Sequence, residues 1–475
     1  MNLTSIQLDR TVGAVLASAS ADALGSQYEF GPELADDFTP VFGRGIFGHA
    51  PGEYTDDTSM AIPILDALAA GADLNDAHTR EEVVARWIDW SRTAKDVGAQ
   101  TRSVLSRIPQ SFTEADVRQA SRAQHDSNGR SGGNGSLMRT GPLALGYLNA
   151  PREESASAAR AVSELTHWEA DNASACILWT VAIRHAILTG EFDIARGLDL
   201  LPADDAARWA EIVDEALAPG AHPRYFSAQN GWVVRAFQGA LAAITGATSL
   251  VDAIERAIRG GNDTDTVAAI AGSLAGALWG GTAVPLSWKR KIHGWPGYNA
   301  DDLVRQAALA ARNGRTDGSG WPLEKMAQPG VRRPGTLEQH PVDPGVLLGS
   351  VATLDALPIE VDAVVSLCRV GAEQVPARVE SIQVWLVDQP DRNANLDFTL
   401  AEAADMIAAL RAEDKTVFVH CAEARSRRSA VAALYSARNL GVALDEAWAG
   451  IRNTLPDYDP KRFLRDAVAR IVRGE

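Results

Sequence analysis

The sequence predicts two domains, an all-α domain followed by an α/β domain with a mostly parallel sheet, and three observations lead to this fold class. The chain has 475 residues, about the length of two to four domains. From Leu8 to Asn313, Ala- and Leu-rich segments alternate with short Gly, Pro and Asp breaks. Short β-branched runs become prominent beyond a Pro- and Gly-rich stretch. We therefore expect domains at residues 1–313 and 344–475, joined by a linker at 314–343.

The first domain is expected to be helical because its apolar residues recur at spacings of three and four, which gives each helix a face to bury. The segments with this pattern are Glu81–Arg92, Glu153–Leu165, Ala173–Leu188 and Val251–Arg259. Another apolar stretch, Thr266–Leu286, has the length of a membrane span. Because it is rich in Ala and Gly and directly follows two aspartates, we predict a buried core helix there.

The second domain shows the pattern of short buried strands between helices. Ala363–Leu367 and Thr416–His420 are predicted strands, and Leu400–Arg411 and Ser429–Leu440 are predicted helices. This alternation is typical of α/β domains with parallel sheets. The segment from Cys421 to Arg427 should therefore form a loop between a strand end and a helix start, a geometry that binds anions.

Composition excludes several classes of protein. The chain has 45 Lys and Arg against 61 Asp and Glu, a net charge of −16, which disfavours general nucleic-acid binding. Its three cysteines, Cys176, Cys368 and Cys421, are too few for a disulfide framework. The N-terminus lacks the pattern of a signal peptide. We expect a cytoplasmic protein with no membrane partner.

Two acidic clusters of similar composition stand at the expected starts of helices. Asp56 and Asp57 lie in the segment Gly52–Thr58, and Asp263 and Asp265 lie in Gly260–Thr266. Either cluster alone could be a helix cap, but two alike are consistent with one shared site. Carboxylate and hydroxyl oxygens suit hard divalent cations, so a pair of Mg²⁺ ions is favoured, with Mn²⁺ as an alternative, over zinc.

Two further segments contribute to the same picture. Ser131–Arg139 is Gly-rich, and with Ser136 as a cap and Arg139 nearby its amides suit a diphosphate. An apolar helix interrupted by Asp22 ends near Glu29. Asp22 taken alone is also compatible with a solvated position on that helix.

Together these clusters resemble the ADP-ribosylglycohydrolase family. The segments that carry the resemblance are Ala21–Gly25, Gly52–Thr58, Gly133–Arg139 and Gly261–Thr266. The resemblance implies an all-α fold with a dinuclear magnesium site that hydrolyses the bond between the anomeric ribose carbon and its acceptor. The metal ligands that it implies are Thr55, Asp56, Asp57, Asp263, Asp265 and Thr266.

The same resemblance assigns roles at the substrate. Glu29 matches a carboxylate near the scissile bond and, with Asp57, is a catalytic candidate. The residues expected to bind the ADP-ribose are Gly133, Asn134, Gly135, Ser136, Met138, Arg139 and His167, although His167 has the equally favoured alternative of a structural histidine. The substrate would be an ADP-ribosylated protein, nucleic acid or small molecule.

The segment His-Cys-x5-Arg, from His420 to Arg427, is similar to that of the cysteine-dependent protein phosphatases, especially the dual-specificity type. The resemblance implies that Cys421 is the nucleophile, that Arg427 holds the phosphate of a phosphorylated substrate, and that Asp388 is the general acid. Asp391 is the reserve candidate for the acid.

Two departures bear on this second activity. Ala424 replaces the usual loop glycine, which is tolerable if the backbone there avoids positive φ. Arg428 stands where a hydroxyl residue commonly follows the arginine, with Ser429 one place later, so release of phosphate from the cysteine is expected to be slow. A domain that binds phosphate without turnover therefore stays an alternative.

The alternatives for the first domain also remain open. The same metal ligands would serve a hydrolase of another N- or O-ribosyl compound. A noncatalytic module that binds ADP-ribose is the competing class.

Overall fold

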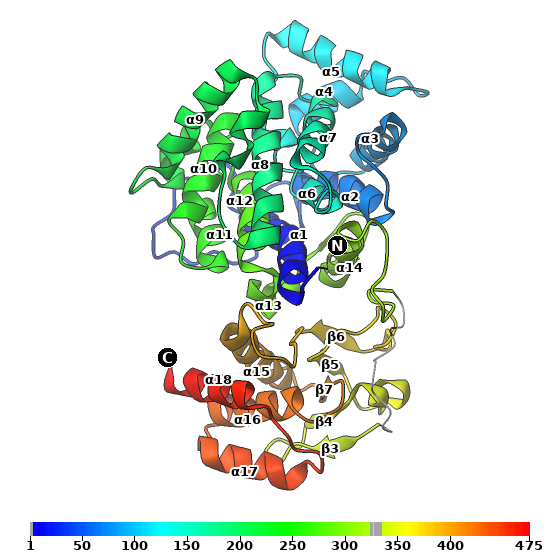
Figure 1. The fold of residues 1–475 in the computed structure, drawn as a ribbon, viewed down its shortest axis with the longest axis vertical. Coiled ribbons are helices and arrows are strands. Elements are labelled where there is room, and N and C mark those ends of the chain that lie inside the picture. The colour runs from blue at the N-terminus through cyan, green and yellow to red at the C-terminus, as the bar shows by residue number, and fades with distance from the viewer. Residues whose placement is uncertain (1–2, 324–325, 327–334) are drawn as a thin grey trace. The chain divides into compact units, whose positions relative to one another are not determined.

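The computed structural model describes residues 3–323, 326 and 335–475 (Figure 1). The chain divides into two compact units, Met1–Val284 with Lys291–Arg315, and Pro285–Arg290 with Thr316–Glu475. Within the predicted linker, residues 324–325 and 327–334 lie outside the described residues. No helix within the described ranges is long and apolar enough to cross a membrane.

The first unit is built from helices, as predicted. Its helices and its one two-residue hairpin are α1 (Ser5–Gly25), α2 (Asp56–Ala69), α3 (Ala77–Ser91), α4 (Ala99–Leu105), α5 (Glu114–Asn128), α6 (Leu143–Gly146), α7 (Arg152–Glu164), α8 (Ala170–Thr189), α9 (Ala203–Leu217), α10 (Val233–Thr245), α11 (Leu250–Arg259), α12 (Thr264–Trp279), α14 (Ala300–Ala310), β1 (His293–Gly294) and β2 (Tyr298–Asn299). The four helices predicted from spacing are confirmed as α3, α7, α8 and α11. The predicted core helix is α12, which is buried but ends at Trp279, because Gly280 takes a φ of 90° and turns the chain.

Helices α1 and α12 pack against each other in the centre of this unit, with their backbones in contact. A Cβ on Gly13 or Gly276 would collide with the backbone of the opposite helix, and a Cβ on Gly25 would lie 2.6 Å from Asp265 Cα. Glycine is required at these positions by space. The close packing brings the end of α1 beside the start of α12, so Asp22 and Asp265 become neighbours.

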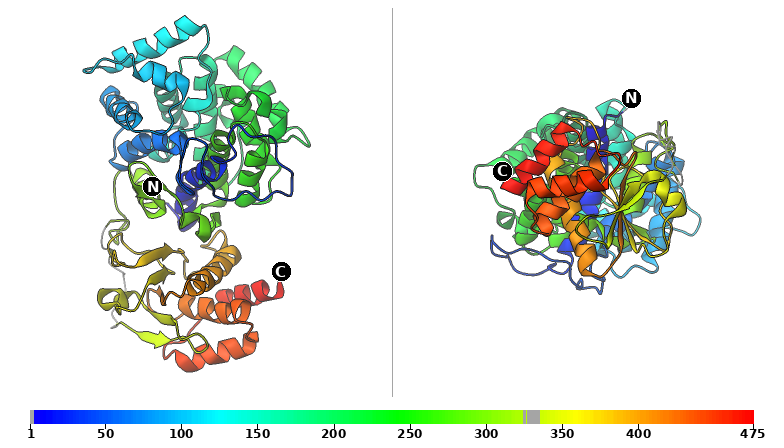
Figure 2. Two further views of the ribbon diagram at one scale, coloured as in Figure 1. Left: turned by 180° about the vertical axis from the view of Figure 1, so that it is seen from behind. Right: turned by 90° about the horizontal axis from the view of Figure 1, so that it is seen from below.

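A long loop joins α1 to α2. It runs from Ser26 to Thr55 with no helix or ladder strand, and Figure 2 shows it in dark blue outside the helical body. One bridge, between Gly31 and Asn262, ties its beginning to the segment before α12. Loops of this length without secondary structure are uncommon and are usually functional.

The second unit is an α/β structure. Its elements are α13 (Leu286–Lys289), β3 (Leu337–Gln339), β4 (Val346–Ser350), β5 (Ala363–Ser366), β6 (Glu380–Gln383), α15 (Leu396–Ala412), β7 (Val417–Cys421), α16 (Arg427–Asn439), α17 (Leu444–Thr454) and α18 (Arg462–Arg473). Among the described residues, five strands form one sheet in the order β3-β4-β7-β5-β6. All pairs are parallel except β3 with β4, which confirms the predicted mostly parallel sheet.

The sheet buries side chains on both faces. Val417 and Val419 point into a core shared with α15 to α18, whereas Phe418 and Val364 point into a smaller core on the other face. Strands buried on both faces read as continuous apolar runs, which is why β5 and β7 could be predicted. The carboxyl ends of the parallel strands meet at one edge, where ligands of α/β sheets bind.

Candidate functional site

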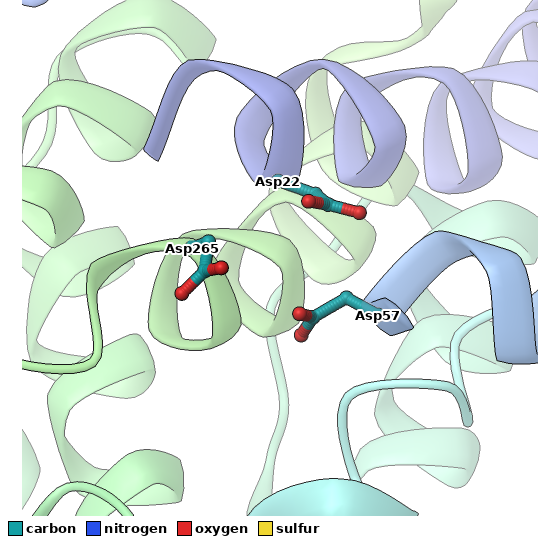
Figure 3. Close-up of side chains that lie close together, drawn as sticks. All are labelled: Asp22, Asp57 and Asp265. Atoms are coloured by element: carbon teal, nitrogen blue, oxygen red, sulfur yellow. The ribbon is translucent and has the colours of Figure 1, made fainter. Parts of the chain in front are cut away.

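Three aspartates from different helices of the first unit face one another. Asp22 lies on α1, Asp57 on α2 and Asp265 on α12 (Figure 3). One carboxylate oxygen of each lies within 4.8 Å of the other two, and all three side chains are buried. The alternative that Asp22 is solvated is wrong, since none of its surface is exposed.

Asp22 holds the start of α2 from a neighbouring helix. Its carboxylate accepts hydrogen bonds from the backbone N–H groups of Thr55 and Thr58, both at 3.0 Å, and from their hydroxyls at 2.8 and 2.6 Å. The N-cap residue Thr55 makes no capping bond with its own side chain. Asp56 and Asp57 stand in the first turn of α2, as the capping interpretation requires, but the carboxylate that accepts from the Thr55 and Thr58 N–H groups is that of Asp22.

A second group of acids adjoins the first. Oxygens of Glu29, Asp263 and Asp265 also lie within 4.8 Å of one another, so Asp265 is common to both groups. The Thr266 hydroxyl donates to Asp57 at 3.4 Å, and Asn134 donates its side-chain amide to Asp263 at 2.8 Å. The predicted Asp57, Asp263 and Asp265 thus lie together, whereas Asp56 belongs to neither group and its carboxylate accepts a bond from the Gly98 N–H at 3.3 Å. Because Asp56 still interacts electrostatically with Asp22 and Asp263, we call the six residues Asp22, Glu29, Asp56, Asp57, Asp263 and Asp265 the acid cluster.

The electrostatics of this acid cluster fit a divalent cation. Burial, followed in effect by the other carboxylates, raises the pKa of Asp56 to about 7, and the pKa values of Asp57 and Asp265 rise well above their ordinary range. One Asp57 oxygen, Oδ1, is buried without a hydrogen-bond partner. Among the ion pairs of the described residues, none involves these acids. Crowded buried carboxylates with an orphaned oxygen fit a divalent cation, whose charge would offset their mutual repulsion.

Sequence reasoning missed two acids. Asp22 was recognised within a motif but not as part of the acid cluster, because its neighbours come from residues far along the chain. Asp96 lies in the loop before α4, and burial and the proximity of Asp56 raise its pKa to about 8. A lone acid in a loop carries no sequence signal of this kind.

The glycine-rich segment is arranged differently from the prediction. Ser136 does not cap a helix; it lies inside a short 3₁₀ turn, Asn134–Ser136, and accepts a bond from Asn172 at 2.8 Å. Gly133 and Gly135 make room for His167, whose Nε2 would lie 3.2 Å from a Cβ on Gly135. A side chain at Gly135 would therefore be tight against the histidine, whereas one at Gly133 would be in ordinary contact with it.

Arg139 is fully buried and is held by protein groups. Its guanidinium lies 4.0 Å from the ring centre of Trp87 and donates to the Thr166 hydroxyl at 2.7 Å. That hydroxyl is 2.8 Å from Nδ1 of His167. Burial lowers the pKa of Arg139 to about 9 and that of His167 well below its ordinary value. Arg139 and Thr166 thus orient a neutral His167 beneath the glycine segment.

We expect the metal-free first unit to lose thermal stability as the pH rises from 5 to 8. Folding raises the pKa of Asp22 to about 6 and that of Asp96 to about 8, chiefly through burial, whereas unfolded aspartates titrate near about 4. Between these values the folded protein binds more protons than the unfolded chain, so the free energy of unfolding falls as pH rises. Thermal melts in EDTA measure the effect; a midpoint that rises across this window would contradict it.

In the second unit, Cys421 ends β7 at the carboxyl edge of the sheet, as predicted. A cavity of about 370 Å³ opens there, lined by Cys421, Arg427, Asp388, Ser426 and Lys461 among others. Asp388 accepts a bond from the Ser426 hydroxyl at 2.8 Å. The predicted nucleophile, phosphate ligand and acid thus line one cavity, whereas Asp391 is not among its lining residues.

Arg427 is held at the cavity by the ends of two neighbouring strands. Its Nη1 donates to the carbonyls of Leu367 and Leu386 at 3.2 and 2.8 Å. Its Nε is buried and has no hydrogen-bond partner among the described residues. Arg427 therefore lines the cavity with one guanidinium donor left unpaired.

The two residues after Arg427 make hydrogen bonds to groups other than Cys421. Arg428 is buried and donates to Glu338 on β3 at 2.9 Å, and the Ser429 hydroxyl donates to the Arg425 carbonyl at 2.6 Å. Neither side chain is therefore free to assist a water at Cys421. This agrees with the expectation of slow release of phosphate.

Ala424 adopts a φ of 58°, so the condition that the loop avoids positive φ is not met. A non-glycine residue costs about 1–2 kcal/mol in this conformation. We expect Ala424→Gly to stabilise the second unit by about 0.5–1 kcal/mol, after the greater chain entropy of glycine is subtracted. Denaturant unfolding measures the change. Ala422→Gly, at a position without positive φ, is the control and should destabilise; a loss of stability in Ala424→Gly would contradict the argument.

Comparisons with known proteins bear on both units. Residues 3–318 match the family model for ADP-ribosylglycohydrolase. The ADP-ribosylarginine hydrolase Tri1 of Pseudomonas putida is 32% identical over 293 residues, which cover 60% of this chain and 74% of that protein. The ADP-ribosyl-[dinitrogen reductase] glycohydrolase of Rhodospirillum rubrum is 28% identical over 289 residues, covering 60% and 90% of the two chains. The solved structure of human DUSP28 is 27% identical to the C-terminal part, with a TM-score of 0.25, and covers 29% of this chain and 93% of that chain.

Proposed function

The chain belongs to the ADP-ribosylglycohydrolase family, and from this premise we propose that its first unit removes ADP-ribose from arginine side chains in a magnesium-dependent hydrolysis. The observation that carries the proposal is the buried acid cluster, in which Asp265 is shared by two groups of acids. Arginine is chosen as the acceptor because the Pseudomonas putida relative is an ADP-ribosylarginine hydrolase. Two groups that share one acid support two bound ions.

The residues divide the work as follows. Asp22, Asp57 and Asp265 would hold one ion, and Asp56, Asp263, Thr55 and Thr266 complete the proposed ligand set. When bound, Mg²⁺ supplies Lewis-acid polarisation of ribose oxygens and a bound water of lowered pKa.

The chain's own groups favour cleavage of the bond between the anomeric carbon and the guanidinium nitrogen. The electron pair of that bond leaves with the nitrogen, and the positive charge that develops on the ribose is stabilised by the surrounding carboxylates. Glu29, at the edge of the acid cluster, has its pKa raised to about 8 by burial and by Asp263 and Asp56. This pKa belongs to the cluster without ions; with Mg²⁺ bound, the ionised carboxylate of Glu29 would be favoured, and it could accept a proton from the attacking water and pass it to the leaving nitrogen. The products are arginine and ADP-ribose.

The test is the release of free ADP-ribose from arginine-, serine- and nucleic-acid-linked substrates, with Mg²⁺ and with EDTA. Metal-dependent release from the arginine linkage alone supports the proposal. Release from another linkage alone would show that the acceptor is serine or nucleic acid rather than arginine. Binding of ADP-ribose with no release from any substrate would favour the noncatalytic module, and activity on another ribosyl compound would favour that alternative.

For the second unit we propose a cysteine-dependent phosphatase. The cavity that contains Cys421, Arg427 and Asp388 supports it. Cys421 would attack phosphorus and form a phosphocysteine, Asp388 would protonate the leaving oxygen, and water would release the phosphate. A substrate that carries both modifications would use both units. We propose the cytoplasm as the compartment, as expected from the sequence.

A further inference from the structure

The loop between α1 and α2 exposes a group of large apolar side chains. Their exposed fractions are 63% for Phe30, 61% for Val41, 50% for Ile46 and 46% for Phe47. We call these four residues the apolar rim. Soluble proteins seldom expose large apolar side chains in groups, and such groups mark binding surfaces.

The members of the apolar rim are held together. The rings of Phe30 and Phe47 make an edge contact with their centres 6.5 Å apart. The Val41 N–H donates to the Tyr28 hydroxyl at 2.9 Å, which fastens Val41 to the turn that precedes Phe30. A turn closed by a bond from Gly48 to Gly45 carries Ile46 and Phe47 at its tip.

The apolar rim adjoins the acid cluster. Phe30 directly follows Glu29, whose carboxylate belongs to the acid cluster. The Phe30 N–H donates to the Asn262 carbonyl at 2.6 Å, and the Asn262 N–H donates to Gly31 at 2.9 Å. Phe30 and Asn262 both adopt positive φ, 56° and 62°. This strained pairing fixes the loop beside Asp263 and leaves the Phe30 ring in solvent.

The loop also carries exposed charge of both signs. Asp37 and Arg44 are exposed on it, and Glu33 lies 4.0 Å from Arg224. A peptide segment attached to the ribose would leave the acid cluster beside Phe30 and therefore beside the apolar rim. A free sugar nucleotide offers no apolar side chains to such a surface, whereas a protein substrate does.

We propose that the apolar rim binds apolar side chains that flank the modified arginine of a protein substrate. This rests on the proposed function and extends it from the linkage to the sequence around the linkage. The apolar rim then selects among ADP-ribosylated proteins, and the acid cluster performs the hydrolysis.

The experiment uses two peptides ADP-ribosylated on a central arginine, one flanked by Leu and Phe and the other by Ser. The full-length protein should show about tenfold higher kcat/KM on the apolar peptide, because each buried apolar side chain favours binding. In the double variant Ile46→Ser, Phe47→Ser the ratio should fall to near one through a higher KM, with activity on the Ser peptide unchanged. Phe192→Ser, an exposed phenylalanine outside the loop, should keep the wild-type ratio.

The outcomes separate this proposal from the proposed function. The rim is not a docking surface if wild type and the double variant show the same ratio of kcat/KM between the two peptides, or if the double variant loses activity equally on both. Either result contradicts this proposal and leaves the proposed hydrolase activity unaffected. Fluorescence anisotropy of the same labelled peptides reads binding without turnover. Suppose that no ADP-ribose is released, but that wild type binds the apolar peptide more tightly than the Ser peptide and the double variant does not. This result would contradict the hydrolase proposal and support the proposed role of the apolar rim. A change of mass in sedimentation on mutating the rim would assign it instead to contact between copies of the chain.

Discussion

Asp265→Asn lowers the magnesium-dependent release of ADP-ribose from an arginine-linked substrate by at least about 100-fold; this is the largest effect that we expect in the first unit. Asp265 is the acid that both groups share, so its replacement weakens two ion sites at once. Metal ions contribute several kcal/mol to such reactions, and about 1.4 kcal/mol is tenfold in rate. Release of free ADP-ribose measures the loss, and Asp57→Ala should behave alike.

A stability measurement separates loss of the ions from loss of the fold. Without metal, the carboxylates repel one another, as their raised pKa values indicate. Asp265→Asn should therefore melt at a higher temperature than wild type in EDTA at pH 8, and Mg²⁺ should stabilise wild type but not the variant. Asp204→Asn, an exposed acid at the start of α9, is the matched control. Activity near wild type in Asp265→Asn would refute the assignment of the acid cluster.

Cys421→Ser should abolish hydrolysis of aryl phosphates by the second unit. In the proposed mechanism the attacking atom is the sulfur of Cys421, which ends β7 at the cavity, and a serine hydroxyl there is a far weaker nucleophile. Cys368→Ser is the control, since burial raises the pKa of Cys368 to about 12 and its thiol stays protonated. Phosphate release that survives in Cys421→Ser would contradict the catalytic proposal and favour a domain that binds phosphate.

Asp388→Asn tests the acid in the same assay. General acids contribute about 10²–10⁴-fold, and the contribution is greatest when the leaving oxygen is most basic. We therefore expect a larger loss on phenyl phosphate than on 4-nitrophenyl phosphate. Equal losses on the two substrates would assign Asp388 a structural role, such as holding Ser426.

The sequence predicted those features that depend on local pattern. Strand β7 and the loop after it follow from a β-branched run that ends in Cys421, and the four spaced helices follow from apolar periodicity. The sequence also predicted four acids of the site, because each pair stands in a distinctive run of hydroxyl and acidic residues: Asp56 with Asp57, and Asp263 with Asp265.

What the sequence could not predict depends on contacts between distant residues. The capping of α2 by Asp22, the burial of Asp96 and the stacking of Arg139 on Trp87 all join segments with no shared pattern. The Gly-rich segment before it predicts that Arg139 lies near a diphosphate, whereas in the structure Arg139 is buried against Trp87 and donates to Thr166. The positive φ of Ala424 is imposed by the loop between β7 and α16 against the preference of alanine.

The backbone contact between α1 and α12 also governs when the acid cluster can form. Residues 5–25 pack against residues 264–279, so the two contacting helices are separated in sequence by nearly the whole length of the first unit. Contacts so distant in sequence slow folding, because a long chain segment must be closed before they are made. During synthesis α1, apolar on nearly every face, must wait for α12 to leave the ribosome. The acid cluster therefore cannot be complete before α12 has been synthesised, and a shortened chain that ends before α12 lacks Asp265, the acid that both groups share.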